Sequence, residues 1–151
     1  MSLDDVDRRL LRLLQVEGRI SNQELAARCH LSPAACHERV RRLNQRGVIQ
    51  RYRAEIDPAA VDLPMLIFVE VLLEKTTGEV FITFGEAVRR TPQILECHMV
   101  AGGFDYLLKA RVRDMEAYRQ FLGELVSMPG VRETRTYAVI EEVKAAAPLP
   151  I

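Results

Sequence analysis

The sequence lacks the patterns that would place it in a membrane or carry it across one. No apolar run approaches the roughly 20 residues that a membrane-spanning helix needs. The N-terminal stretch MSLDDVDRRLLRLL is acidic and then amphipathic, which is not the pattern of a secretory signal peptide. We therefore expect a cytoplasmic protein with no membrane partner.

Cysteine is scarce, and the usual motifs of catalysis and metal binding are missing. The three cysteines have no framework spacing, so we expect free thiols in a reducing compartment. Each is followed by a histidine, but no C-x-x-C or H-x-x-x-H spacing accompanies these pairs. No Ser-His-Asp arrangement or glycine-rich phosphate loop appears either. We expect no metal, no cofactor and no enzymatic activity.

Lysine is absent from the first 60 residues, which contain 11 arginines and 8 acidic residues. Residues 61–151 contain 10 basic and 13 acidic residues, so the equal totals of 21 and 21 hide a basic half and an acidic half. This asymmetry suggests two domains with different partners, and the basic domain is a candidate for contact with phosphates.

Three helices are predicted in the basic half. The first is indicated over residues 4–17 by helical spacing of the apolar residues Val6, Leu10, Leu13 and Leu14. Ser21 and Glu24 form a capping box ahead of a short helix over 22–29. Ser32 is a second N-cap with Pro33 in the first helical position, and the third helix runs to about Arg46. A short helix, a tight turn and a longer basic helix form a helix-turn-helix pattern.

The third predicted helix has an inward face and a polar face. Cys36, Val40 and Leu43 share the inward face. The polar face suits a helix whose N-terminal part enters the major groove, where arginine reads guanine and glutamine or glutamate read adenine or cytosine. Residues 48–56 alternate and are predicted to form a short wing strand. The residues expected to contact DNA are Ser32, Pro33, Ala34, His37, Glu38, Arg41, Arg42, Gln45, Arg51 and Arg53, with Arg39 and Arg46 also placed for phosphates.

An α+β fold with two domains is predicted for the whole chain. A winged helix-turn-helix domain over 1–54 is followed by a proline-containing linker over 55–64 and a ferredoxin-like βαββαβ sandwich over 65–151. In the sandwich, GGFD is predicted to be a hairpin turn whose glycines tolerate positive φ. Asp114 is expected to cap the second helix, whose buried face would comprise Met115, Tyr118, Phe121, Leu122 and Leu125.

From about Leu3 to Lys144 the chain resembles the Lrp/AsnC family of feast/famine transcriptional regulators, most of all its leucine-responsive branch. The resemblance lies in EGRISNQELA, LSPAACHERVRRL, GVIQRYRAEIDP, ECHMVAGGFDYLLKARVRDMEAYRQFLGELVSMPGV and TRTYAVIEEVK. It implies a reader of double-stranded DNA fused to an effector domain, dimers that assemble further, often to octamers, and amino acids such as leucine as effectors. Arg51 stands where the family often has glycine, and Ala101 where a hydroxyl residue is common.

The loop VAGGFDYLL could bind a free amino acid. Gly102 and Gly103 leave backbone N–H groups uncovered for a carboxylate, and Asp105 offers an anion for an ammonium group. The alternative is a plain hairpin in which Asp105 only forms the turn. The resemblance adds residues of the last strand and a pocket between dimers. It makes the effector-binding candidates His98, Gly102, Gly103, Asp105, Tyr106, Thr134 and Thr136.

Two other functions stay open at this point. An architectural DNA-binding protein would bend DNA and show no thermal shift with any amino acid. An amino-acid-sensing adaptor subunit of an enzyme complex would bind DNA weakly and without regard to sequence.

Overall fold

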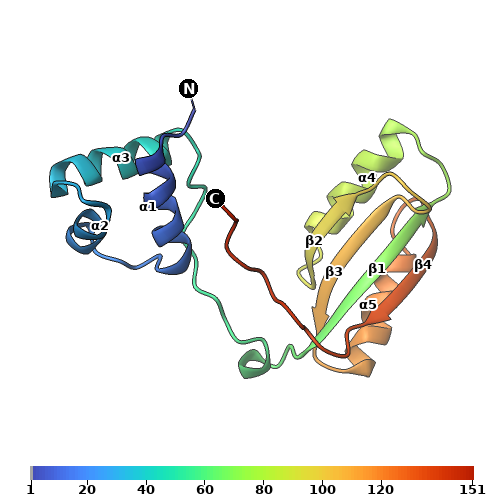
Figure 1. Cartoon of the computed structure of the whole chain (residues 1–151). Helices are drawn as coiled ribbons and strands as arrows, with labels where there is room; N and C mark the ends of the chain where they lie inside the picture. Colours follow the sequence, from blue (N-terminus) through green and yellow to red (C-terminus); the bar gives the residue numbers. More distant parts are fainter. Residues whose placement is uncertain (1) are drawn as a thin grey trace. The chain divides into compact units, whose positions relative to one another are not determined.

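A computed structural model describes residues 2–151, and in it the chain forms two compact units (Figure 1). The first unit is the chain up to Glu55 together with Val143–Ile151, and the second is Ile56–Glu142. Among the described residues, no helix has the length and apolar character needed to cross a membrane.

The first unit is built on three helices: α1 (Asp5–Val16), α2 (Asn22–Cys29) and α3 (Pro33–Gln45). They begin where the sequence predicted, because Asp4, Ser21 and Ser32 each accept a hydrogen bond from a backbone N–H of the first turn. Their inward faces form one core of Leu10, Leu25, Ala26, Cys29 and Cys36. Burial raises the pKa of both the Cys29 and the Cys36 thiol.

The predicted wing strand over residues 48–56 is wrong. Residues 50–57 have neither helical nor strand structure, and the described part of the first unit contains no strand with which they could pair. A strand needs a hydrogen-bonded neighbour, and alternating residues alone do not supply one. Arg51 and Arg53 therefore lie on an exposed, irregular segment.

The last residues of the chain pack on α1. Gln15 brackets Leu149: its Oε1 accepts a hydrogen bond from Leu149 N at 2.6 Å, and its Nε2 donates to Leu149 O at 3.3 Å. Arg12 Nη1 donates to the carbonyl oxygen of Ile151 at 3.0 Å. These contacts explain why Val143–Ile151 belongs to the first unit.

The second unit has the predicted ferredoxin-like order of elements. They are β1 (Met65–Leu73), α4 (Gly78–Arg89), β2 (Ile94–Met99), β3 (Tyr106–Val112), α5 (Met115–Val126) and β4 (Val131–Ala138), preceded by a 3₁₀ turn (Ala59–Val61). The strands lie in the order β2-β3-β1-β4, and every neighbouring pair is antiparallel.

Helices α4 and α5 cover the same face of this sheet (Figure 1). Phe84 of α4 and Phe121 and Leu125 of α5 are fully buried against β1 and β3. Asp114 caps α5 as predicted, but Met115 is 58% exposed and is not part of the buried face. The opposite face, called the open face below, carries Phe68, Leu72, Leu107 and Tyr137 among charged residues.

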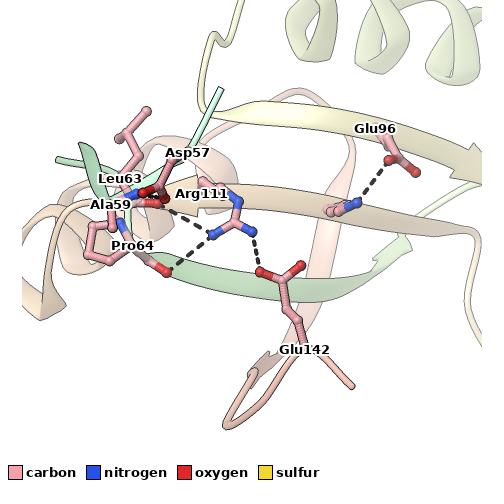
Figure 2. A network of polar contacts seen from close by, with 8 residues as sticks. Asp57, Ala59, Leu63, Pro64, Glu96, Arg111 and Glu142 are labelled. Carbon is pink, nitrogen blue, oxygen red and sulfur yellow. Dashed lines mark hydrogen bonds and ion pairs between the residues drawn. The ribbon is translucent and has the colours of Figure 1, made fainter. Parts of the chain in front are cut away.

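Arg111 of β3 ties together the two ends of the second unit (Figure 2). Its Nη1 donates to the carbonyl oxygens of Leu63 and Pro64 at 3.5 and 3.2 Å, and its Nη2 pairs with Glu142. The side chain is only 12% exposed. The connector before β1 and the chain after β4 are therefore held at the same place.

Candidate functional site

The polar face of α3 is exposed as predicted. Ala34, His37, Glu38, Arg41 and Gln45 are all exposed, whereas Cys36 and Leu43 on the opposite side are buried. Ser32 and Pro33 start the helix, and Ser32 Oγ accepts the backbone N–H of Ala35 at 3.2 Å. Long side chains with hydrogen-bond donors and acceptors thus project from α3, which is held in place by its contacts with the core of the first unit.

The turn between α2 and α3 has a support that was not predicted from the sequence. Asn22 Nδ2 donates to the carbonyl oxygen of Pro33 at 2.9 Å, joining the start of α2 to the start of α3. His30 adopts φ 56° at the end of α2, and only three residues separate α2 from α3. An asparagine directly after a capping serine was the only available signal, and it did not indicate a partner eleven residues away.

Arg41 is paired with Glu38, one turn earlier on the same face. Arg41 Nε donates to Oε2 at 2.9 Å and Nη2 to Oε1 at 2.7 Å. Hydrogen bonding from Arg41 lowers the pKa of Glu38, and the same bonds raise the pKa of Arg41. Both groups are therefore ionised at neutral pH.

The sequence suggested that Arg39 faces outward and contacts phosphates. In the structure its side chain instead joins α3 to α1. Its Nη1 lies 2.7 Å from Asp4 Oδ2 and 2.8 Å from Asp7 Oδ1. The Asp4 carboxylate, more than Asp7, raises the pKa of Arg39. Arg42 Nη2 is 3.5 Å from the same Asp7 oxygen, and its side chain remains 44% exposed. Asp7 itself is buried.

These four residues form what we call the Asp7 cluster: Asp4, Asp7, Arg39 and Arg42. A buried carboxylate that receives two guanidinium groups fixes the rotation of α3 against α1. The sequence hint was the spacing of Asp4 and Asp7 by three residues, which places both on one side of the first turn. Their partners could not be chosen from the several arginines of α3 by sequence alone.

The loop between β2 and β3, where an effector site was predicted, is anchored by Asp105. Asp105 N donates to Val71 O at 3.0 Å, and Leu73 N donates to Asp105 Oδ2 at 2.7 Å. This carboxylate therefore holds the loop against the end of β1 with its Oδ2 atom. Its other oxygen, Oδ1, is the atom that could accept a hydrogen bond from an ammonium group.

The two glycines of this loop do not adopt the positive φ that the predicted hairpin turn suggested. The residues with positive φ among those described are His30, Gly47, Asp62 and Gly130, so neither Gly102 nor Gly103 needs that conformation. A Cβ added at either glycine would meet no atom within 4 Å. Nothing within the described chain thus requires glycine at these two positions.

A small pocket of about 40 Å³ opens beside this loop on the open face. Two of the predicted residues, Gly103 and Thr134, line it with Glu70, Leu72, Phe104, Glu133 and Arg135. Thr134 pairs with the buried Val71, so its position in the strand belongs to the helix-covered side. A volume of that size holds only a few water molecules, so a single chain does not enclose an amino acid here.

The other predicted effector residues lie elsewhere. Tyr106 is 6% exposed and packs in the core, with its ring 4.7 Å from that of Phe84, and burial raises its pKa. Thr136 pairs with the buried Val69, on the helix-covered side. His98 lies on β2, the strand at the opposite edge from β4, about 14 Å away at normal strand spacing. One chain does not bring His98 and Thr134 into one site.

A capped helix-turn-helix with an exposed polar recognition face, joined to a ferredoxin-like domain with a glycine loop, defines a DNA-binding regulator with a ligand-binding domain. Two family profiles match: the AsnC-type helix-turn-helix domain over residues 3–44 and the Lrp/AsnC ligand binding domain over residues 66–149. The chain belongs to the Lrp/AsnC family of transcriptional regulators.

Known relatives match along almost the whole chain. The leucine-responsive regulatory protein of Escherichia coli is 53% identical over 99% of this chain and 92% of its own length. A transcriptional regulator of Neisseria meningitidis, solved in complex with L-methionine, has 35% identity and a TM-score of 0.94, covering 99% of this chain and 97% of that one. An AsnC family regulator from Agrobacterium tumefaciens has 30% identity and a TM-score of 0.94, covering 98% and 97%.

Proposed function

We propose that this protein is a sequence-specific transcriptional regulator of amino-acid metabolism genes whose DNA binding or assembly responds to leucine or a similar amino acid. The observation that carries the proposal is the exposed face of α3 around Arg41, in one chain with a glycine loop that has open space beside it. The L-methionine complex of the Neisseria relative and the name of the Escherichia relative support an amino acid as effector. We assign the protein to the cytoplasm and assign it no enzymatic activity, metal or cofactor.

Residues 1–54 form the DNA-binding domain in this proposal, and residues 65–151 the effector and oligomerisation domain. His37, Glu38, Arg41 and Gln45 face the major groove with Ala34, while Arg51 and Arg53 contact phosphates from the exposed segment after α3. Arg42 contributes with the exposed part of its side chain.

Arg41→Ala is expected to lose sequence-specific DNA affinity, and Arg51→Ala is expected to lose affinity for DNA of any sequence. Arg41→Ala removes a base contact and should cost about 1–3 kcal/mol on the preferred duplex, with a smaller loss on a scrambled one. Arg51→Ala should weaken both duplexes alike and reduce the slope of log affinity against log salt by about 1. Gel shifts across a salt series measure both effects. Equal losses on the two duplexes for Arg41→Ala would remove this residue from base readout.

The open face of the sheet is where we propose that two copies of the chain meet. Phe68 lies between Lys109 on β3 and Tyr137 on β4, with Leu72 and Leu107 nearby and no helix from this unit over them. An apolar centre with a charged surround is typical of an interface. The pocket beside Gly103 is too small for an amino acid, and His98 lies far from Thr134. Both observations favour an effector site that a further copy of the chain completes. We propose that the dimers assemble to an octamer.

Phe68→Lys in the full chain is therefore expected to lower the oligomeric mass measured by light scattering, because a buried ammonium would oppose the apolar contact. The control is Ile82→Lys, the same kind of change on α4, where Ile82 is 64% exposed on the helix layer. An unchanged mass for Phe68→Lys would place the interface on another surface.

A thermal-shift screen against the standard amino acids tests the effector half of the proposal. A ligand that binds only the folded protein raises its melting temperature. A shift with leucine or a related amino acid supports a responsive regulator. No shift with any of them would favour an architectural DNA-binding protein, and sequence-indifferent DNA binding with a shift would favour an adaptor subunit.

A further inference from the structure

The ion pair between Glu38 and Arg41 fixes the direction of one guanidinium group on the exposed face of α3. The two residues are three apart, so their side chains meet on one side of the helix. The contact is bidentate, with Arg41 Nε and Nη2 each donating to one carboxylate oxygen, at 2.9 and 2.7 Å. It occupies the side edge of the guanidinium and leaves the end edge, formed by Nη1 and Nη2, pointing away from Glu38.

The end edge is enough to read a base. A guanidinium has five N–H donors, and two of them are used by Glu38. The three that remain lie on Nη1 and Nη2, from which two nearly parallel hydrogen bonds reach O6 and N7 of guanine. A pre-oriented side chain also loses less rotamer freedom on binding than a free one.

Neither stability nor general DNA affinity explains an acid at this place. The two side chains are 51% and 58% exposed, and an ion pair at such exposure contributes little to folding. A carboxylate on a face that meets phosphates also opposes binding to DNA of any sequence. The effect that remains is that the ion pair fixes the orientation of the Arg41 guanidinium group.

We propose that Glu38 is a positioning residue that sets sequence specificity. It holds Arg41 end-on toward a guanine, and it lowers affinity for all other sequences through its charge. This inference rests on the proposed DNA-reading function of α3, and it replaces direct reading of a cytosine as the role of Glu38. The neighbouring Arg39 is held in the Asp7 cluster, so Arg41 is the partner that Glu38 orients.

The test uses the full chain and two probes: the duplex that the wild-type protein enriches from a random pool, and a scrambled duplex of the same composition. The discrimination ratio is the affinity for the first divided by that for the second. Arg41→Ala should lower this ratio by about 5- to 150-fold, the equivalent of one bidentate guanine contact. Glu38→Ala should tighten binding to the scrambled duplex and still lower the ratio by about fivefold or more.

Two further variants separate geometry from charge. Glu38→Gln keeps one acceptor oxygen for Arg41 but not the charge, so its ratio should fall between wild type and Glu38→Ala. Asp5→Ala makes the same charge change at an exposed position of α1, and should raise both affinities together and leave the ratio unchanged. In the double variant Glu38→Ala/Arg41→Ala, the ratio should equal that of Arg41→Ala alone.

Each opposing outcome has a definite meaning. An unchanged ratio for Glu38→Ala, with a normal loss for Arg41→Ala, would overturn the positioning role and leave the proposed function intact. A further loss from Glu38→Ala in the Arg41→Ala background would show that Glu38 reads a base itself and would also overturn it. A wild-type protein that enriches no duplex would overturn the sequence-specific function and the positioning role together.

Discussion

Asp7→Ala is expected to destabilise the first unit by about 2–4 kcal/mol, more than the loss of any exposed charge in that unit. The variant removes a buried acceptor that lies 2.8 Å from Arg39 and 3.5 Å from Arg42. It leaves two guanidinium groups beside each other with only Asp4 to balance them. Arg42 Nε is already buried without a hydrogen-bond partner, so the loss of its nearest carboxylate is not compensated.

Hydrogen exchange of peptides from α1 and α3 measures this effect locally, because exchange reports the stability of the unit to which a helix belongs. The matched control is Asp5→Ala, which removes the same charge from an exposed position of the same helix turn. Asp7→Ala should also reduce preferred-duplex binding although it makes the protein more basic, since α3 loses its fixed rotation. Equal exchange in the two variants would show that the Asp7 cluster does not hold α3.

Asp105→Asn is expected to abolish the response to the amino-acid effector and leave DNA binding nearly unchanged. The loss of a buried charge partner for an ammonium group costs about 2–5 kcal/mol, which is a fall in affinity of roughly 30-fold or more. Asparagine is the informative replacement, because its side-chain oxygen still accepts the hydrogen bond from Leu73 N. Alanine at this position would disturb the loop as well as the charge.

Calorimetric titration with the amino acid that gives the largest thermal shift measures the affinity, and gel shifts with and without it measure the response. By linkage, a variant that no longer binds the effector also loses any effector-dependent change in oligomer size. Glu133→Gln is the control, since Glu133 is an acid that lines the small pocket beside the loop, which Asp105 itself does not line. Unchanged affinity in Asp105→Asn with a large loss in Glu133→Gln would move the ammonium site to β4.

Local signals in the sequence predicted most of the fold. The caps at Ser21, Ser32 and Asp114 and the order of strands and helices depend on residues close in sequence, and all of these predictions are confirmed. The wing failed because strand pairing depends on a neighbour elsewhere in the chain.

The candidate site was harder to predict for the same reason. The helical spacing separated Arg41 on the polar face from Arg39, which was expected to contact phosphates, but only the packing of α3 on α1 shows that Arg39 is held in the Asp7 cluster. The hydrogen bond from Leu73 N to Asp105 spans 32 residues and leaves no local trace. The core position of Tyr106 was predictable, since it alternates with the buried Leu108, Ala110 and Val112.

The buried thiols of the first unit give its folded state a chemical protection. Cys29 is 1% exposed and Cys36 is fully buried, and burial raises the pKa of both, so little thiolate is present and the sulfur atoms are shielded from oxidants and alkylating reagents. The reactivity of these two sulfur atoms is therefore governed by how often the three helices open. Oxidation of these two thiols would therefore take place mainly in the molecules whose helix core has opened, and the stability of that core limits the damage.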